Sequence, residues 1–467
     1  LTLNGSEEDW IWRTQGGSGF ITSDDPDLRD YHPNGTQNAY DEIHGHYALI
    51  GYLGRLSYNY NSKYYLDVLT RIDGSSRFAP DTHWGTFPAA SVAWRISQES
   101  FMQSLTFIND LKIRGSYGIL GNEQTSGGWK YISIANLTPP SYNSGNPNMV
   151  SPGVAFGNYA NAELTWEKIH SGNIGFDALL FDNRLNVTFD YYRKVTKGII
   201  QSTGLTPSAG FELPTDLNIA DVLNRGFEFQ VGYNRSFGKV NVAVSGNFST
   251  VYNRVLSLQN HTALRGNTFS LEEGKPVGFL YGYKMGGIFQ DQKQIDDWNL
   301  SHTDNLSTEQ KPGDIYFQDL YGTPTAGSTD HNLKRDSIVN ENDQTYLGKT
   351  IPGYDYGFTL SANYSGFDVA LFFHGVGDVQ KFNGMRAAGE SMNTNGRNQF
   401  TTVLNAWTAD HPSNSMPRAV YGDPNNNNRF SDRFVENAGY LRLQNLQIGY
   451  AVPQKFLDET NVFRALR

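Results

Sequence analysis

Apolar and polar positions alternate with a period of two along much of this chain. In RLNVTFDYYR, residues 184–193, the apolar side chains of Leu185, Val187 and Phe189 share one parity and polar side chains lie between them. The same alternation recurs in residues 226–234, 239–245, 354–364 and 367–374. Because successive side chains of a strand point to opposite faces, each stretch predicts a β-strand with one apolar and one polar face.

About twelve strand candidates follow from this pattern. They lie at residues 47–60, 63–73, 85–96, 111–118, 164–180, 184–194, 224–235, 239–253, 354–364, 367–375, 439–450 and from 461 onward. Most reach the roughly 9–11 residues that a tilted strand needs to cross a bilayer. Segment 439–450 alternates poorly, because Arg442 and Gln444 have the parity of Leu446 and Ile448. A β-bulge would restore its phase.

The connections between these strands are of two kinds. Short turns of Asn, Asp, Gly, Ser and Lys at 60–63, 181–183, 236–238 and 365–366 predict hairpins. The other connections, 120–163, 196–222, 256–354 and 375–439, are long and rich in Gly, Asn, Ser, Thr and Pro. Compact soluble domains rarely contain unstructured loops of that length. Outer-membrane barrels combine short periplasmic turns with long extracellular loops, so the asymmetry favours a membrane barrel.

Composition is compatible with that architecture. The 467 residues are 38% hydrophobic and 13% aromatic, with 27 Tyr, 28 Phe and 48 Gly. Such amphipathic rings form the girdles of membrane barrels at the two bilayer interfaces. No run of 18 apolar residues is present, so a transmembrane helix is not expected and a closed barrel is the other structure that could span lipid.

Charge and cysteine content exclude several function classes. The net charge of −10 disfavours nucleic-acid binding, which requires a basic surface. The absence of cysteine excludes disulfides, cysteine-ligated metals and a thiol nucleophile. The chain also lacks a G-x-S-x-G elbow and a phosphate-binding P-loop pattern, so we do not expect an enzyme.

Several motifs occur in a fixed order. RIDGSSRFAP at 71–80 precedes WGTFPAASVAWRISQE at 84–99 and INDLKIRGSYG at 108–118. Further on come YGYK at 281–284, GIFQ at 287–290, PGDI at 312–315 and NAGYLRLQNL at 437–446. Together they closely resemble the SusC/RagA-type TonB-dependent outer-membrane transporters of Bacteroidota.

The resemblance implies an all-β fold, a transmembrane antiparallel barrel of about 22 strands whose lumen holds a plug domain. It implies TonB-dependent active import of a nutrient, an oligosaccharide or a peptide, across the outer membrane. The implied partners are a SusD-like surface lipoprotein acting as a lid, TonB, and the lipid bilayer with its lipopolysaccharide. No cofactor is implied.

We expect this chain to be the C-terminal part of such a protein. Residues 1–45 would be a loop and strand segment of the preceding part of the barrel, and 46–467 a barrel portion of about twelve strands. No plug or TonB-box segment is recognisable, no export signal begins the chain, and residues 463–467 do not end on an aromatic residue. The plug and the final strands are therefore expected outside this chain.

Strand parity predicts two sets of residues, one facing the lumen and one facing lipid, and the loops supply a third set of candidates. Polar strand positions are predicted to face the lumen: Asn186, Thr188, Asp190, Glu228, Gln230, Asn241, Ser245 and Thr359. Their apolar neighbours are predicted to face lipid: Leu185, Val187, Phe189, Phe229, Val231, Val242 and Phe358. Aromatic loop residues are candidates for contact with substrate or lipoprotein: Trp129, Tyr131, Tyr142, Trp298 and Trp407.

Metal and acid–base sites have weak support. The family often carries a calcium-like loop after PGDI, but here the acidic residues Asp319 and Asp343 are far apart, which leaves only a weak possibility of Ca²⁺. His44 and His46 lack a third ligand. The adjacent pairs at 272–273 and 296–297 are interpreted as solvated loop charges.

Two alternatives stay open. A passive porin would also be a barrel, but without a plug. A soluble all-β surface protein that binds or cleaves glycans would bury its apolar strand faces in protein and would stay in solution without detergent.

Overall fold

A computed structural model describes residues 2–15, 40–124, 130–132, 159–203, 215–261, 263–307, 309–324, 333–391, 398–453 and 457, and four two-residue strands between 135 and 156. Side chains are described from residue 48 onward within these ranges. No helix in the described residues is long and apolar enough to cross a membrane. The chain divides into two compact units, the first made of residues 1–100, 112–174 and 194–221, and the second of residues 101–111, 175–193 and 222–467.

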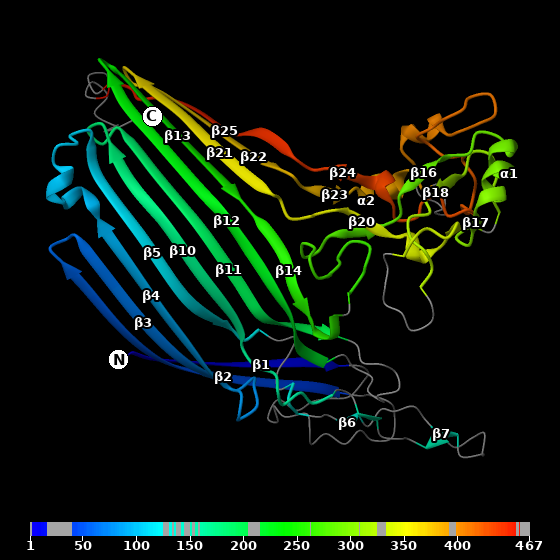
Figure 1. Ribbon diagram of the computed structural model, residues 1–467, viewed down its shortest axis with the longest axis horizontal. Helices are drawn as coiled ribbons and strands as arrows, with labels where there is room; N and C mark the ends of the chain where they lie inside the picture. The colour runs from blue at the N-terminus through cyan, green and yellow to red at the C-terminus, as the bar shows by residue number, and fades with distance from the viewer. Residues whose placement is uncertain are drawn as a thin grey trace. The chain divides into compact units, whose positions relative to one another are not determined.

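The dominant element is an antiparallel sheet of thirteen strands (Figure 1). Its path is β1-β2-β3-β4-β5-β10-β11-β12-β13-β21-β22-β25, and β14 also pairs with β12. The bounds are β1 (Thr2–Gln15), β2 (Tyr40–Tyr60), β3 (Tyr64–Ser75), β4 (Trp84–Arg95), β5 (Ile108–Asn122), β10 (Glu167–Leu180), β11 (Leu185–Thr203), β12 (Thr215–Phe237), β13 (Val240–Thr250), β14 (Tyr252–Leu258), β21 (Tyr354–Tyr364), β22 (Phe367–Gly377) and β25 (Tyr440–Tyr450).

Eleven of the predicted strand segments correspond to strands of this sheet. The segment from 461 onward lies outside the described residues. Two strands of the sheet were not predicted, β1 and β14. β1 pairs with β2 along its whole length, from Thr2 opposite Leu53 to Gln15 opposite Tyr40. Residues 1–45 therefore already contribute a strand to the sheet.

The hairpin prediction is confirmed where the turns are described. Ser365 and Gly366 connect β21 to β22, and both have the positive φ that a type I′ turn requires. Residues 181–183 also have positive φ between β10 and β11. These turns fix the register, and the register fixes which side chains share a face.

The expected bulge is present in β25. Phe372 of β22 lies opposite Asn445, whereas Phe373 lies opposite Leu443, so Gln444 is an extra residue. The bulge puts Leu441 and Leu443 on the same face as Leu446. Arg442 is moved to the opposite face, where it pairs with His374. An apparent break in alternation is therefore a local insertion in a regular strand.

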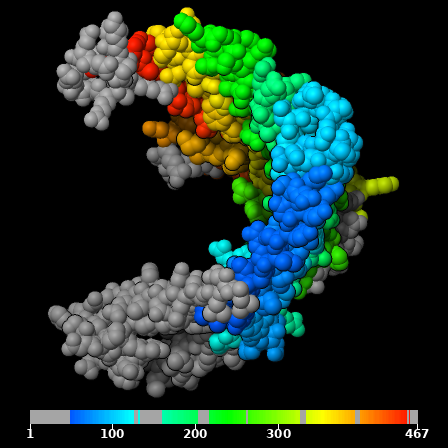
Figure 2. Space-filling model, turned by 90° about the vertical axis from the view of Figure 1, so that its left-hand side faces the viewer, coloured from blue at the N-terminus to red at the C-terminus, as the bar shows by residue number. Residues whose placement is uncertain are grey.

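In the first unit, β2, β3 and β4 lie side by side and are drawn in blue (Figures 1 and 2). One face of these strands is apolar and exposed, with Leu56, Leu66 and Val92 36–65% accessible. A small buried core at the end of the strands contains Phe78, Phe87, Leu164 and Trp166.

In the second unit, one face carries a belt of aromatic rings across five strands. Phe176, Phe189, Phe227, Phe248 and Tyr354 make successive ring contacts, with centroids 5.8–6.2 Å apart. Phe229 is 38% exposed, and Phe189 and Phe358 are half-buried, so none of the three lies in a protein core. A soluble sandwich would have buried this face, which is the opposite of what the strands show.

The long segments 256–354 and 375–439, expected as unstructured loops, contain folded structure. Tyr283, Ile288, Ile315, Phe317 and Val339 form a buried apolar cluster there. The helices are α1 (Gln292–Ser301) and α2 (Gly384–Gly389), with 3-10 turns at Gln259–His261, Glu341–Asp343, Thr401–Asn405 and Asp432–Phe434. The short strands are β15 (Leu280–Gly282), β16 (Met285–Ile288), β17 (Thr303–Asp304), β18 (Ile315–Phe317), β19 (Ile338–Val339), β20 (Thr345–Gly348), β23 (Gln380–Phe382) and β24 (Val435–Asn437).

The remaining elements are short. The 3-10 turns Ile96–Gln98 and Ser100–Met102 connect β4 to β5. In segment 120–163, β6 (Ala135–Asn136) pairs with β9 (Ala155–Phe156), and β7 (Tyr142–Asn143) pairs with β8 (Val150–Ser151).

Candidate functional site

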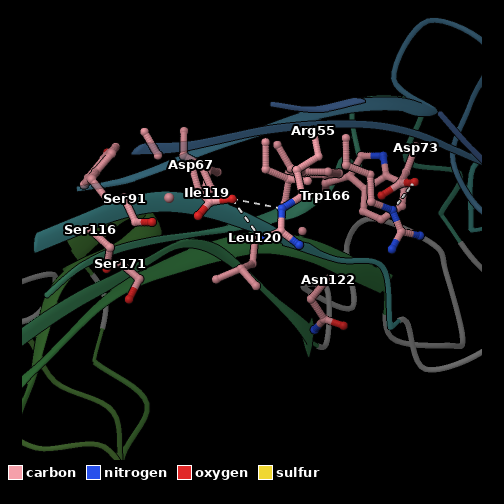
Figure 3. Close-up of a pocket in the computed structure, with 18 of the residues that line it drawn as sticks. Arg55, Asp67, Asp73, Ser91, Ser116, Ile119, Leu120, Asn122, Trp166 and Ser171 are labelled. Carbon is pink, nitrogen blue, oxygen red and sulfur yellow. Dashed lines mark hydrogen bonds and ion pairs between the residues drawn. The ribbon is translucent and has the colours of Figure 1, made fainter. Parts of the chain in front are cut away.

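A groove of about 730 Å³, lined by both apolar and polar side chains, lies on the first unit (Figure 3). Its lining comes from β2 to β5, with Trp166 and Ser171 added. In Figure 3, Ser91, Ser116 and Ser171 lie at one end, Arg55 and Asp67 in the middle, and Asp73 and Asn122 toward the other end. The groove is on the face opposite the exposed apolar side chains of Leu56, Leu66 and Val92.

Strand register creates a continuous row of polar side chains in this groove. Ser57 of β2 lies opposite Asp67 of β3, which lies opposite Ser91 of β4, which lies opposite Ser116 of β5. Directly opposed residues of neighbouring strands point to the same face. We call Ser57, Asp67, Ser91 and Ser116 the polar row.

Two ion pairs lie within the groove. The Arg55 Nε and Nη2 donate to Asp67 Oδ1 at 3.0 and 2.8 Å, and the Ser57 hydroxyl donates to the same oxygen. The Arg55 and Asp67 side chains are 65% and 39% exposed, so this pair contributes little to stability. It leaves a guanidinium and a carboxylate oxygen accessible to a polar solute.

A second pair closes the other end of the groove. Arg71 Nε donates to Asp73 Oδ1 at 2.6 Å, and the Asp73 side chain is only 8% exposed. Opposite it stands Gly51, where an added Cβ would come within 2.4 Å of Asp73 Oδ1. The glycine therefore makes the space that the carboxylate occupies.

The buried core beneath the groove fixes its floor. The rings of Phe78 and Phe87 contact Trp166 at 5.4 and 5.3 Å, and the Trp166 indole N–H donates to the carbonyl of His83 at 2.9 Å. The motif at 71–80 therefore folds a loop onto Trp166. Its Asp73 pairs with Arg71.

Beside the core, an amide–carboxylate pair links three strands. Asn122 Nδ2 donates to Glu167 Oε2 at 2.7 Å, and the backbone N–H of Ile200 donates to Glu167 Oε1 at 2.6 Å. Both oxygens of the buried carboxylate are thus satisfied, which holds the ends of β5, β10 and β11 together.

None of the groove's charged residues was among the predicted site residues. The sequence does contain a sign of the charged face: within residues 64–73, the charged residues Asp67, Arg71 and Asp73 all have the same parity. What the sequence lacked was the register that joins β3 to its neighbours.

The polar residues predicted for the lumen share one face of the sheet. Gln230 lies opposite Asn247, and Ser245 lies opposite Thr359. Glu228 lies opposite Ser249, and Asn241 lies opposite both Ser236 and Asn363. On β11, Thr188 donates to Asp177 at 3.2 Å, Asn186 lies beside Gly232, and Asp190 lies beside Gly175. That this face borders the lumen stays a prediction.

The aromatic candidates differ in what the structure says of them. Trp129 lies outside the described residues, as does the side chain of Tyr142, while Tyr131 is half-buried. The Trp298 ring stacks on His302 at 3.9 Å, and the Trp407 Nε1 donates to Gln290 at 3.0 Å. Both rings pack on the apolar cluster of the loops. Their contact with a substrate or partner stays a prediction.

The weak metal candidates Asp319 and Asp343 accept hydrogen bonds from backbone amides. Asp343 accepts from the amides of Leu320, Tyr321 and Asn340 at 2.7–3.0 Å. Asp319 accepts from the amide of Ser337, and burial raises the pKa of its carboxyl. Within the described residues no group of three or more potential ligands could hold a metal ion.

Comparison with known proteins places this geometry in a family. Residues 2–464 match the family model described as TonB dependent receptor-like, beta-barrel. The chain belongs to the TonB-dependent receptor β-barrel family. The sheet described above is therefore part of the wall of such a barrel.

Named members of the family are similar over most of this chain. TonB-dependent receptor P39 of Formosa agariphila is 30% identical over 456 residues, covering 90% of this chain and 41% of that protein. TonB-dependent receptor SusC of Bacteroides thetaiotaomicron is 25% identical over 432 residues, which cover 88% of this chain and 39% of that protein. The chain thus spans about two fifths of the length of these TonB-dependent receptors.

A solved structure supports the barrel fold. The RagAB peptide importer in its closed-closed state superposes with a TM-score of 0.75 over 99% of this chain and 48% of that chain, at 22% identity. The predicted SusC/RagA type of TonB-dependent receptor is confirmed by these matches.

Proposed function

We propose that this chain forms the C-terminal part of a barrel that imports an oligosaccharide or a peptide across the outer membrane, driven by TonB. The observation that carries the proposal is the pairing of the family match over residues 2–464 with a two-faced sheet. One face exposes apolar and aromatic side chains, as lipid requires, and the other carries the groove with the polar row.

The groove supplies the chemistry that a polar nutrient needs. Hydroxyls of Ser57, Ser91 and Ser116 donate and accept hydrogen bonds, and the accessible charges of Arg55 and Asp67 recognise either a sugar hydroxyl or a peptide group. Transport by this route requires binding and release only. We therefore propose a transporter without covalent chemistry.

Two partners belong to the proposal. A SusD-like lipoprotein would cover the long loops, and TonB would supply the energy for import. The folded loop segments 256–354 and 375–439 support the first, because they offer an ordered surface. The similar fold of the RagAB peptide importer supports a peptide as one of the two substrate classes.

The test compares nutrient uptake by cells that contain or lack TonB, with the full-length protein expressed in both. We expect uptake to require TonB and the protein to fractionate with the outer membrane. A passive porin would import equally well without TonB. A soluble glycan-binding protein would be recovered without detergent. Either result would end the proposal.

A second measurement on the same protein distinguishes an oligosaccharide substrate from a peptide substrate. Binding of an oligosaccharide mixture and of a peptide mixture is compared between the wild type and the variant Asp67→Asn/Ser91→Ala. Loss of binding for one mixture identifies the class, and unchanged binding for both would remove the groove from the transport route.

A further inference from the structure

A second groove lies on the outer face of the second unit. It has a volume of about 370 Å³ and is formed where β12 meets β13 and β14, drawn in green in Figure 1. Tyr191, Phe227 and Tyr252 give it aromatic walls, and these rings are 38–44% exposed. Tyr191 and Phe227 share the parity of the apolar face of β11 and β12, so the groove opens on the side that meets lipid.

Cationic groups border this groove. The Arg225 guanidinium lies 4.6 Å from the centroid of the Tyr252 ring. Arg254 shares the parity of Tyr252 on β14 and is exposed. Lys349 lines the groove too, but its ammonium is neutralised by Asp378. Within the described part of the chain neither Arg225 nor Arg254 forms an ion pair. Arg225 therefore gives the lining of the groove a net positive charge, and Arg254, two residues beyond Tyr252, lies next to that lining without being part of it.

The position of Arg225 along β12 places the groove at a membrane border. The row Arg225, Phe227, Phe229, Val231, Tyr233, Arg235 points to the apolar face. Ten residues of strand extend about 33 Å, which at a tilt of about 40° corresponds to roughly 25 Å across the membrane. That is the height of the apolar band of an outer-membrane barrel, so the two arginines mark its two borders.

The border at Arg225 is the outer one. The short turn of residues 238–239 follows Arg235 and Phe237, and short turns are periplasmic in this family's barrels. The long loop after β14 begins at the other end, near Arg225.

We propose that this groove binds the phosphorylated headgroup of a lipid in the outer leaflet, with a phosphate oxygen on Arg225 and Arg254 and an acyl chain along Tyr191 and Phe227. The inference rests on the proposed function, because it requires the chain to span the outer membrane. Arginine favours phosphate because its planar fork donates two hydrogen bonds. A lipid covers both the charge and the rings, whereas a free anion would leave the rings uncovered.

The experiment uses the full-length receptor purified in detergent, with a phosphorylated glycolipid from the outer leaflet as the probe. Binding is measured by native mass spectrometry for the wild type, R225Q and the double variant R225Q/R254Q. The matched control is R235Q, since Arg235 also lies over an aromatic ring, Phe237 at 4.9 Å, at the other end of the same strand. The comparison ligands are the same lipid without its phosphate groups and inorganic phosphate.

We expect the affinity for the phosphorylated lipid to fall about fivefold for each arginine removed. R235Q should bind it as the wild type does. Equal binding of the dephosphorylated lipid, an equal loss in R235Q, or displacement by inorganic phosphate at the lipid's own concentration would each overturn the proposal. Uptake by the same variants is scored separately. Lipid binding without TonB-dependent uptake would refute the proposed function alone, and intact uptake without lipid binding would refute this inference alone.

Discussion

At the scale of single residues, the glycines of the first unit show why its core forms. A Cβ on Gly85 would lie 2.3 Å from the Phe87 ring, and one on Gly121 would lie 2.1 Å from it. The two glycines therefore make room for the ring that packs on Trp166. The shared parity of the charged residues in β3 is visible in the sequence, although it was not used for a prediction, whereas this role of Gly85 and Gly121 is not visible there. They contact Phe87 from two different strands, and no local pattern records that contact.

Gly121→Ala should destabilise the protein by about 1–3 kcal/mol, because the new methyl group must displace the Phe87 ring from a packed site. Urea unfolding in detergent micelles measures the change. The matched control is Gly54→Ala, where an added Cβ would meet nothing within 4 Å. Similar midpoints for the two variants would show that Phe87 has space to move.

At the scale of elements, strands were predictable and the loop structure was not. The period-two pattern located eleven strands because each has several consecutive alternations, and the phase break at Gln444 predicted the bulge in β25. The apolar cluster around Ile315 is assembled from strands of two to four residues, which are too short to show any period. β1 was missed because NGSEEDWIWRTQ has no clear alternation at its start.

The turn between β4 and β5 is stabilised by one carboxylate. Glu99 accepts hydrogen bonds from the Tyr64 hydroxyl at 2.7 Å, the Trp94 indole at 3.2 Å and the Lys63 ammonium at 3.1 Å. These bonds, led by that from Tyr64, lower the pKa of Glu99. One side chain thus joins the ends of β3 and β4 to the turn.

Because the pKa of Glu99 is lower in the folded state, its contribution to stability is complete above its unfolded pKa and is lost as the pH falls through the folded value. Glu99→Gln should therefore be less stable than the wild type at pH 7, and the difference should shrink below pH of about 4. Unfolding midpoints from pH 7 to pH 3 provide the measurement. The control is Glu309→Gln, because Glu309 pairs with Lys311 alone, whereas Glu99 accepts hydrogen bonds from three side chains. The pH dependence of the stability difference should therefore be smaller for this control. A difference that is constant with pH would contradict this role for the charge.

At the scale of the whole molecule, the two faces of the sheet differ in chemistry, one carrying apolar and the other polar side chains. Phe229 and Gln230 are neighbours in β12, and they pair with Phe248 and Asn247 on opposite faces. The fold class followed from the sequence because alternation, short turns and long loops agree on it. The groove did not follow, since it requires the register of four strands.

Phe229→Arg should cost about 2–4 kcal/mol of stability in a bilayer, because Phe229 is near the middle of the apolar band and an arginine there must enter hydrocarbon. Gln230→Arg, one residue away, should cost much less, since its side chain points to the polar face. Unfolding of the receptor from lipid vesicles gives both values. Equal losses of stability in the two variants would mean that both faces meet the same solvent.

The polar row has a consequence for the proposed passage of a nutrient through the barrel. Neighbouring strands are about 4.8 Å apart, so the row offers a hydrogen-bonding group at each such step. Since barrel strands are inclined, a line drawn straight across them also descends, by about 9 Å over three steps. Under the proposed function, a permeating molecule that follows this inclined row would exchange one polar contact for the next, so its desolvation barrier would be divided into several small ones.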